Sequence, residues 1–81
     1  MRPIGEQVRA WREARGWSQR ALAERAGVGY VLIARLELGQ TDPRLSTLRW
    51  LAEALNVTVG SLVDGTPGSG KRPARQRARG K

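Results

Sequence analysis

The side chains of this chain that can carry chemistry are mostly cations. Its 81 residues hold 15 Lys and Arg but only 7 Asp and Glu, which gives a formal net charge of +8 and a pI of 11.7. Guanidinium groups bind phosphates and can donate two parallel hydrogen bonds to one base edge. The composition therefore predicts a polyanionic partner, which is DNA, RNA or an anionic membrane.

The residues that catalysis and metal binding most often need are missing. The sequence has no His and no Cys, which excludes the commonest general base, thiolate chemistry, zinc thiolates and disulfides. It also has no paired carboxylates at a useful spacing for acid–base catalysis. We predict that the protein is not an enzyme and that it holds no cofactor and no metal.

No segment is predicted to enter a membrane. The longest unbroken apolar run, residues 30–34, is far shorter than the roughly 20 residues that span a bilayer. Residues 1–6 lack the apolar region of a signal peptide. We therefore expect a cytoplasmic location and no membrane partner, which leaves a nucleic acid as the polyanion.

The distribution of charge divides the chain in two. Residues 1–63 hold nine Arg and six acidic residues, whereas residues 64–81 hold six cations and one acid. The second part starts with a Gly-, Ser- and Pro-containing stretch and shows no apolar periodicity. We predict a folded domain over 1–63, followed by a flexible linker and a disordered basic tail over 64–81. The tail cations expected to contact phosphates are Lys71, Arg72, Arg75, Arg77, Arg79 and Lys81.

Apolar periodicity and helix start and stop signals predict an all-α domain. A first helix begins near Ile4 and stops at Gly16, and Trp11 and Trp17 are assigned to the core. A last short helix is capped by Thr58. The fourth helix is expected to start with Asp42 as its cap and Pro43 as its first residue, with a core stripe at Leu45, Leu48, Leu51, Ala52 and Leu55.

The second and third helices are separated by a very short turn. Ser18 can cap the second helix, and only residues 26–28 join it to the third, which spans 30–38 and is closed by Gly39. Gly27 supplies the positive φ that a sharp turn needs. This spacing is typical of a helix-turn-helix, whose second helix enters the major groove of DNA.

Several segments together resemble the Cro and phage-repressor type of helix-turn-helix domain, the XRE family. The matching segments are VRAWREARGWSQ at 8–19, LAERAGV at 22–28, IARLELG at 33–39 and PRLSTL at 43–48. The resemblance covers about residues 4–63 and implies a compact, lambda-repressor-like bundle of five helices. It further implies a transcription regulator, most simply a repressor, that binds double-stranded DNA on the nucleoid as a homodimer.

The resemblance also assigns roles to individual residues. Gln19 matches a position against the phosphate backbone, and Arg35 matches a groove-facing position from which it can bind guanine O6 and N7. Arg12 and Glu37 match a structural ion pair between the first and third helices. The full set expected to bind DNA is Ser18, Gln19, Gly29, Tyr30, Val31, Ala34, Arg35, Gln40 and Arg44.

Other interpretations stay open at this stage. Tyr30 and Val31 can touch thymine methyl groups or sugar carbons, but they can also belong to a protein-binding surface with Leu38 and Trp50, as in an antitoxin or an adaptor. A third hypothesis is binding of RNA or of any nucleic acid through the basic tail. Trp50 lies off the core stripe, so it either forms a dimer contact with residues 59–63 or covers the last helix of its own chain.

Overall fold

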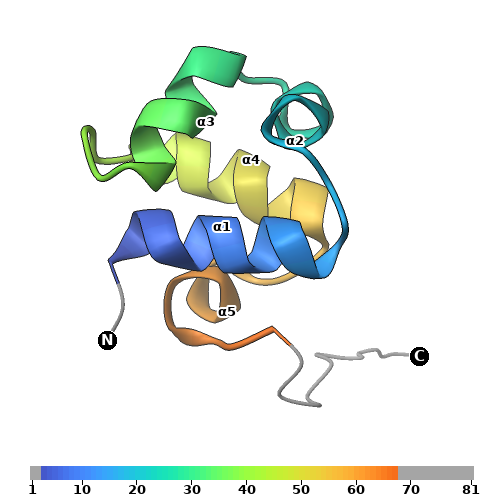
Figure 1. The fold of residues 1–81 in the computed structure, drawn as a ribbon. Coiled ribbons are helices and arrows are strands. Elements are labelled where there is room, and N and C mark those ends of the chain that lie inside the picture. Colours follow the sequence, from blue (N-terminus) through green and yellow to red (C-terminus); the bar gives the residue numbers. More distant parts are fainter. Residues whose placement is uncertain (1–2, 68–81) are drawn as a thin grey trace.

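The protein is all-α, as the sequence predicts. A computed structural model describes residues 3–67, and within that range it contains five helices and no strand (Figure 1). The helices are α1 (Ile4–Ala14), α2 (Gln19–Ala26), α3 (Tyr30–Glu37), α4 (Leu45–Leu55) and α5 (Val59–Asp64). In Figure 1, α1 crosses the centre of the molecule, with α2 and α3 on one side and α5 on the other.

Two of the helices, α2 and α5, start with the side-chain caps that the sequence predicts. The Ser18 hydroxyl oxygen accepts a hydrogen bond from the Ala21 amide at 3.0 Å, and that of Thr58 accepts one from the Ser61 amide at 2.9 Å. Each cap satisfies an amide of the first helical turn that has no partner inside the helix. The caps therefore fix where α2 and α5 start.

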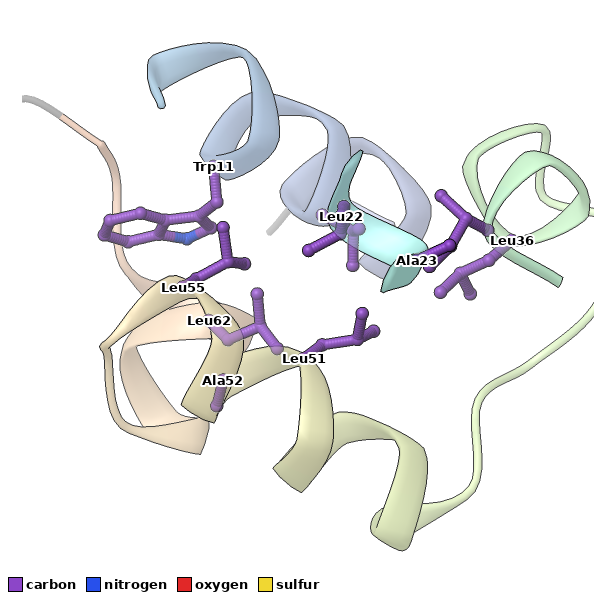
Figure 2. Packing of buried hydrophobic residues seen from close by; sticks show 10 residues of the cluster. Trp11, Leu22, Ala23, Leu36, Leu51, Ala52, Leu55 and Leu62 are labelled. Carbon is purple, nitrogen blue, oxygen red and sulfur yellow. The ribbon is translucent and has the colours of Figure 1, made fainter. Parts of the chain in front are cut away.

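One compact core holds the five helices together. Figure 2 shows Leu22 of α2 at its centre, with Trp11 of α1 beside Leu55 and Leu62. Trp11 belongs to the buried cluster, as predicted, whereas Trp17 is half-buried and packs against the cluster. The buried apolar residues are Val8, Trp11, Leu22, Ala23, Ile33, Leu36, Leu51, Ala52, Leu55 and Leu62.

Two close contacts attach α1 to its neighbours. Gly5 is buried in α1, and a Cβ atom at that position would overlap the backbone carbonyl of Leu36 at the end of α3. Gln7 is buried as well, and its Nε2 donates to the carbonyl oxygens of Leu62 at 3.1 Å and Gly65 at 2.7 Å. The folded part therefore includes α5 to its end at Asp64 and the following glycine.

The predicted start of α4 is wrong. Arg44 is the N-cap, with extended backbone angles, and its carbonyl oxygen accepts the first helical bond from Leu48, so Asp42 and Pro43 lie before the helix. Because α4 begins at Leu45, that residue lies in a first turn at the edge of the core and is 57% exposed. Thr47 is buried instead, and the apolar stripe starts with the half-buried Leu48.

Candidate nucleic-acid interface

The unit formed by α2, its turn and α3 has the predicted geometry. Gly27 adopts a left-handed conformation with φ of 74°, and the Val28 amide bonds back to the carbonyl of Ala23 at 3.0 Å. Ala23 is buried and lies beside Leu36 of α3 in Figure 2, where a larger side chain would separate the two helices. The short turn and the small residue together fix α3 against α2.

One face of α3 is left open to solvent. Ile33 and Leu36 are fully buried, whereas Val31, Arg35 and Leu38 lie on the opposite side, where Val31 is 57% and Leu38 is 72% exposed. The spacing of four, then three residues places these three side chains in one row along the helix. This row is apolar at both ends and carries a single cation, Arg35, in its middle.

The other residues of the predicted set surround this row. Tyr30, the first residue of α3, is 40% exposed, and Ala34 is half-buried. Gln40 lies after α3, where its backbone N–H donates to the backbone carbonyl of Arg35 at 2.9 Å. Ser18 and Gly29, which precede the two helices, are exposed as well, and so are Gln40 and Arg44 between α3 and α4.

A buried polar network lies behind the interface. Arg12 of α1 donates twice to the Glu37 carboxylate, from Nε to Oε2 at 2.7 Å and from Nη2 to Oε1 at 2.9 Å. Its Nη1 also donates to the carbonyl of Trp17 at 2.7 Å. The Arg12 side chain is only 12% exposed and that of Glu37 is 4% exposed. The ion pair implied by the resemblance is thus present, and it joins α1, the turn before α2 and the end of α3.

The electrostatics of this network favour the charged form of Arg12. The hydrogen bond to the Glu37 carboxylate raises the pKa of the Arg12 guanidinium above its ordinary value, against the opposing effect of burial. Arg12 therefore keeps its charge throughout the pH range in which proteins are studied. A permanent charge that is largely buried makes its carboxylate partner indispensable.

Gln19 is connected to the same network. Its Nε2 donates to Oε1 of Glu37 at 3.1 Å, and the side chain is half-buried at the start of α2. A glutamine amide has two N–H donors and a carbonyl oxygen, so this bond fixes its orientation and leaves one donor for an outside group. The first-turn amides of α2 lie at the same end of the helix, where an anion is favoured.

The sequence analysis did not single out Arg20. Its guanidinium carbon lies 4.5 Å from the centroid of the Tyr30 ring, so a cation–π contact connects the first turn of α2 to the first residue of α3. A second stack on the same helix joins Arg25 to Trp17 at 4.3 Å. The one sequence signal for Arg20 is its position directly after Gln19, because the rest of α2 and the turn separate it from Tyr30.

The described part of the chain carries little net charge. Residues 3–67 hold eight arginines and seven acidic residues, a formal net charge of +1. Any attraction of this domain to a polyanion must therefore come from local placement of its arginines. The tail cations Lys71, Arg72, Arg75, Arg77, Arg79 and Lys81 lie outside the described residues.

Residues 3–67 show neither a metal site nor a membrane span. No group of acidic residues there could hold a metal ion. None of the five helices in that range is long and apolar enough to cross a membrane.

Comparison with known proteins identifies the class. A family model described as helix-turn-helix matches residues 8–62, so the chain belongs to that family, as the resemblance to Cro and phage repressors indicated. The P22 c2 repressor protein, in a crystal structure with synthetic operator 9T, has a similar fold with a TM-score of 0.72 and 32% sequence identity. That match covers 80% of this chain and 98% of the repressor chain.

Similar sequences carry the names of regulators. The HTH-type transcriptional regulator SinR of Bacillus subtilis is 34% identical over 62 residues, which cover 75% of this chain and 56% of SinR. The immunity repressor protein of Bacillus phage phi105 is 35% identical over 60 residues, which cover 74% of this chain and 42% of the repressor. The chain thus spans about half the length of these relatives.

Proposed function

We propose that this chain is a sequence-specific DNA-binding transcriptional regulator that acts as a repressor and places α3 in the major groove. The observation that carries the proposal is the open face of α3, with Arg35 in its middle, on a helix-turn-helix unit similar to that of an operator-bound repressor. The chain acts by binding and not by catalysis, and its place of action is the nucleoid in the cytoplasm.

The parts of the proposed interface have different roles. Arg35 can donate two parallel hydrogen bonds to guanine O6 and N7, and Val31 can contact thymine methyl groups. Gln19 and the first-turn amides of α2 bind a phosphate and set the register of the protein on the duplex. Arg44 is the cation of the α3–α4 connection, and Gln40 adds a neutral donor beside it.

Selection of genomic fragments followed by footprinting tests the function and identifies the operator. On that operator Arg35→Ala should cost about 1–3 kcal/mol of binding free energy, while binding to random DNA changes much less. Arg49→Ala is the matched control, because it removes an exposed arginine of α4 outside the proposed interface. Equal losses on both DNAs would reduce Arg35 to a phosphate contact.

We also propose that the protein binds as a homodimer to a two-fold site with half-sites about 34 Å apart. One short α3 offers few base contacts, and two-fold repetition multiplies their discrimination. The proposed contact includes the exposed Trp50 and the half-buried Val59 and Val63, since Leu62 between them is fully buried in its own chain. The test is a titration of operator DNA with the protein, in which the number of chains bound per operator and the length of the footprint are both measured. A monomer that protects one half-site with full affinity would contradict the proposed homodimer.

The six tail cations are proposed to contact phosphates without reading sequence. They bring most of the formal charge of +8, because residues 3–67 contribute only +1. Affinity measured against salt concentration for the full chain should therefore show a slope steeper than the folded part alone can produce. A slope that the tail does not change would mean that it does not touch DNA.

A protein-binding role is the second candidate function. It is favoured by the exposed apolar side chains of Tyr30, Val31, Leu38 and Trp50, which a DNA-binding surface does not require. An antitoxin or adaptor would bind one defined protein with these residues and would show no footprint on selected fragments. Binding to any RNA or DNA with equal affinity would instead support a general nucleic-acid-binding role.

A further inference from the structure

The stack of Arg20 on Tyr30 joins the exposed starts of α2 and α3. The guanidinium carbon lies 4.5 Å from the ring centroid, inside the range of about 6 Å over which a cation is attracted to an aromatic face. Both side chains are exposed, so neither is needed to fill the core. The contact therefore calls for an explanation other than packing.

Stacking leaves the hydrogen-bonding capacity of Arg20 unused. A guanidinium above a ring carries its N–H donors at the edge of its plane, where they remain open to an oxygen acceptor. The ion pairs found among residues 3–67 involve Arg9 and Arg12, so no carboxylate in that range forms an ion pair with Arg20. The ring thus holds a cation whose N–H donors are open to an outside acceptor.

The position of this cation matches a place where an anion is already favoured. Arg20 is the second residue of α2, directly after Gln19, whose side chain is fixed by its bond to Glu37. The first-turn amides of α2 have no intrahelical acceptors except where Ser18 caps the helix. A phosphate at this helix end can therefore receive donors from the backbone, from Gln19 and from Arg20.

We propose that Tyr30 is a positioning residue whose ring holds the Arg20 guanidinium to bind a DNA backbone phosphate at the start of α2. This inference rests on the proposed DNA-binding function and adds Arg20, which lies outside the predicted set, to the interface. It also changes the interpretation of Tyr30, because a ring that supports Arg20 acts on the backbone and not on base edges. Base reading then rests on Val31, Ala34 and Arg35.

The experiment compares four variants on the selected operator and on a random duplex: Arg20→Ala, Tyr30→Leu, Tyr30→Phe and Arg20→Ala combined with Tyr30→Leu. Tyr30→Leu should weaken binding about two- to fivefold on both DNAs, because the ring no longer holds the cation. Arg20→Ala should weaken both at least as much and lower the salt slope by about 0.9, the value of one phosphate contact. Tyr30→Phe keeps the ring and should bind both DNAs like the unmodified chain. The double variant should have the same affinity and the same salt slope as Arg20→Ala.

Arg25→Ala is the matched control. Arg25 is an exposed arginine of the same helix and stacks at 4.3 Å on Trp17, which precedes α2, so its removal costs the same charge and the same kind of contact. It should leave the salt slope close to that of the unmodified chain. An equal fall of the slope in Arg25→Ala would reduce the effect of Arg20 to net charge and overturn the proposal.

The geometry can be checked without DNA. In the free protein the NMR signals of the Arg20 side chain should show a ring-current shift that Tyr30→Leu abolishes and Tyr30→Phe retains. A Tyr30→Leu loss confined to the operator would show that the ring reads bases, and an unchanged salt slope in Arg20→Ala would remove the phosphate contact; either result overturns the inference. If the unmodified full chain binds neither the operator nor the random duplex, that result refutes the proposed DNA-binding function itself and is distinct from the two results above.

Discussion

Replacing Glu37 by leucine should destabilise the domain strongly, because this carboxylate is the acceptor at the centre of the buried network. The change removes the partners of three donors: Nε and Nη2 of Arg12, at 2.7 and 2.9 Å, and Nε2 of Gln19, at 3.1 Å. Arg12 keeps only its bond to the carbonyl of Trp17 and stays charged in a site where its side chain is 12% exposed.

The magnitude follows from the burial of the pair. Removing one partner of a buried ion pair costs about 3–5 kcal/mol, because the other charge stays behind without compensation. The remaining bond to Trp17 and the partial exposure of Arg12 place the expected loss near the lower end, at about 3 kcal/mol. A domain of this size is stable by only about 3–10 kcal/mol, so the loss is a large share of the total.

The assay is urea unfolding followed by far-UV circular dichroism, arranged as a double-mutant cycle with Arg12→Met. The double variant should recover most of the loss of either single variant, because no charge is then left buried. Arg9→Met is the control, since it breaks the exposed ion pair with Glu13 but leaves the Glu13 carboxylate in place, and it should cost no more than about 1 kcal/mol. If Glu37→Leu does not fold, Glu37→Gln keeps one acceptor and replaces it in the cycle. Strictly additive losses would refute the coupling.

Gly5→Ala should destabilise the domain by about 1–3 kcal/mol in thermal unfolding, because the new Cβ would overlap the α3 backbone. Gly60→Ala is the control and should be neutral or stabilising, because a Cβ there would meet only a side-chain atom at 3.9 Å. Leu51→Ala should cost about 2–5 kcal/mol of unfolding free energy, and Leu45→Ala, at an exposed position, much less; equal costs would contradict the corrected start of α4. Removal of residues 68–81 takes away six cations and should leave the unfolding midpoint unchanged while the salt slope of DNA binding falls by up to about 0.9 per lost phosphate contact.

The sequence by itself determined the local structure and the kind of protein. Ser18 and Thr58 specify helix starts because their hydroxyls satisfy first-turn amides, and Gly27 specifies a sharp turn because it tolerates a positive φ. With Ile33 and Leu36 facing inward, helical periodicity alone places Val31 and Arg35 on the outside of α3. These are properties of residues close together in the chain, so a single sequence contains them.

Only the tertiary structure decided which residues meet across the chain and where the core ends. Periodicity tells which side of a helix is apolar, but the exposure of Leu45 depends on how far α4 extends past its neighbours. The bond of Gln19 to Glu37 and the stack of Arg20 on Tyr30 depend on the angle and separation at which α2 and α3 pack, which no local pattern specifies. The same holds for the approach of Gly5 to Leu36, because it requires α1 to lie directly against the end of α3. Contacts between distant segments are set by the packing of whole elements, and here that packing determines how the side chains of the interface are held.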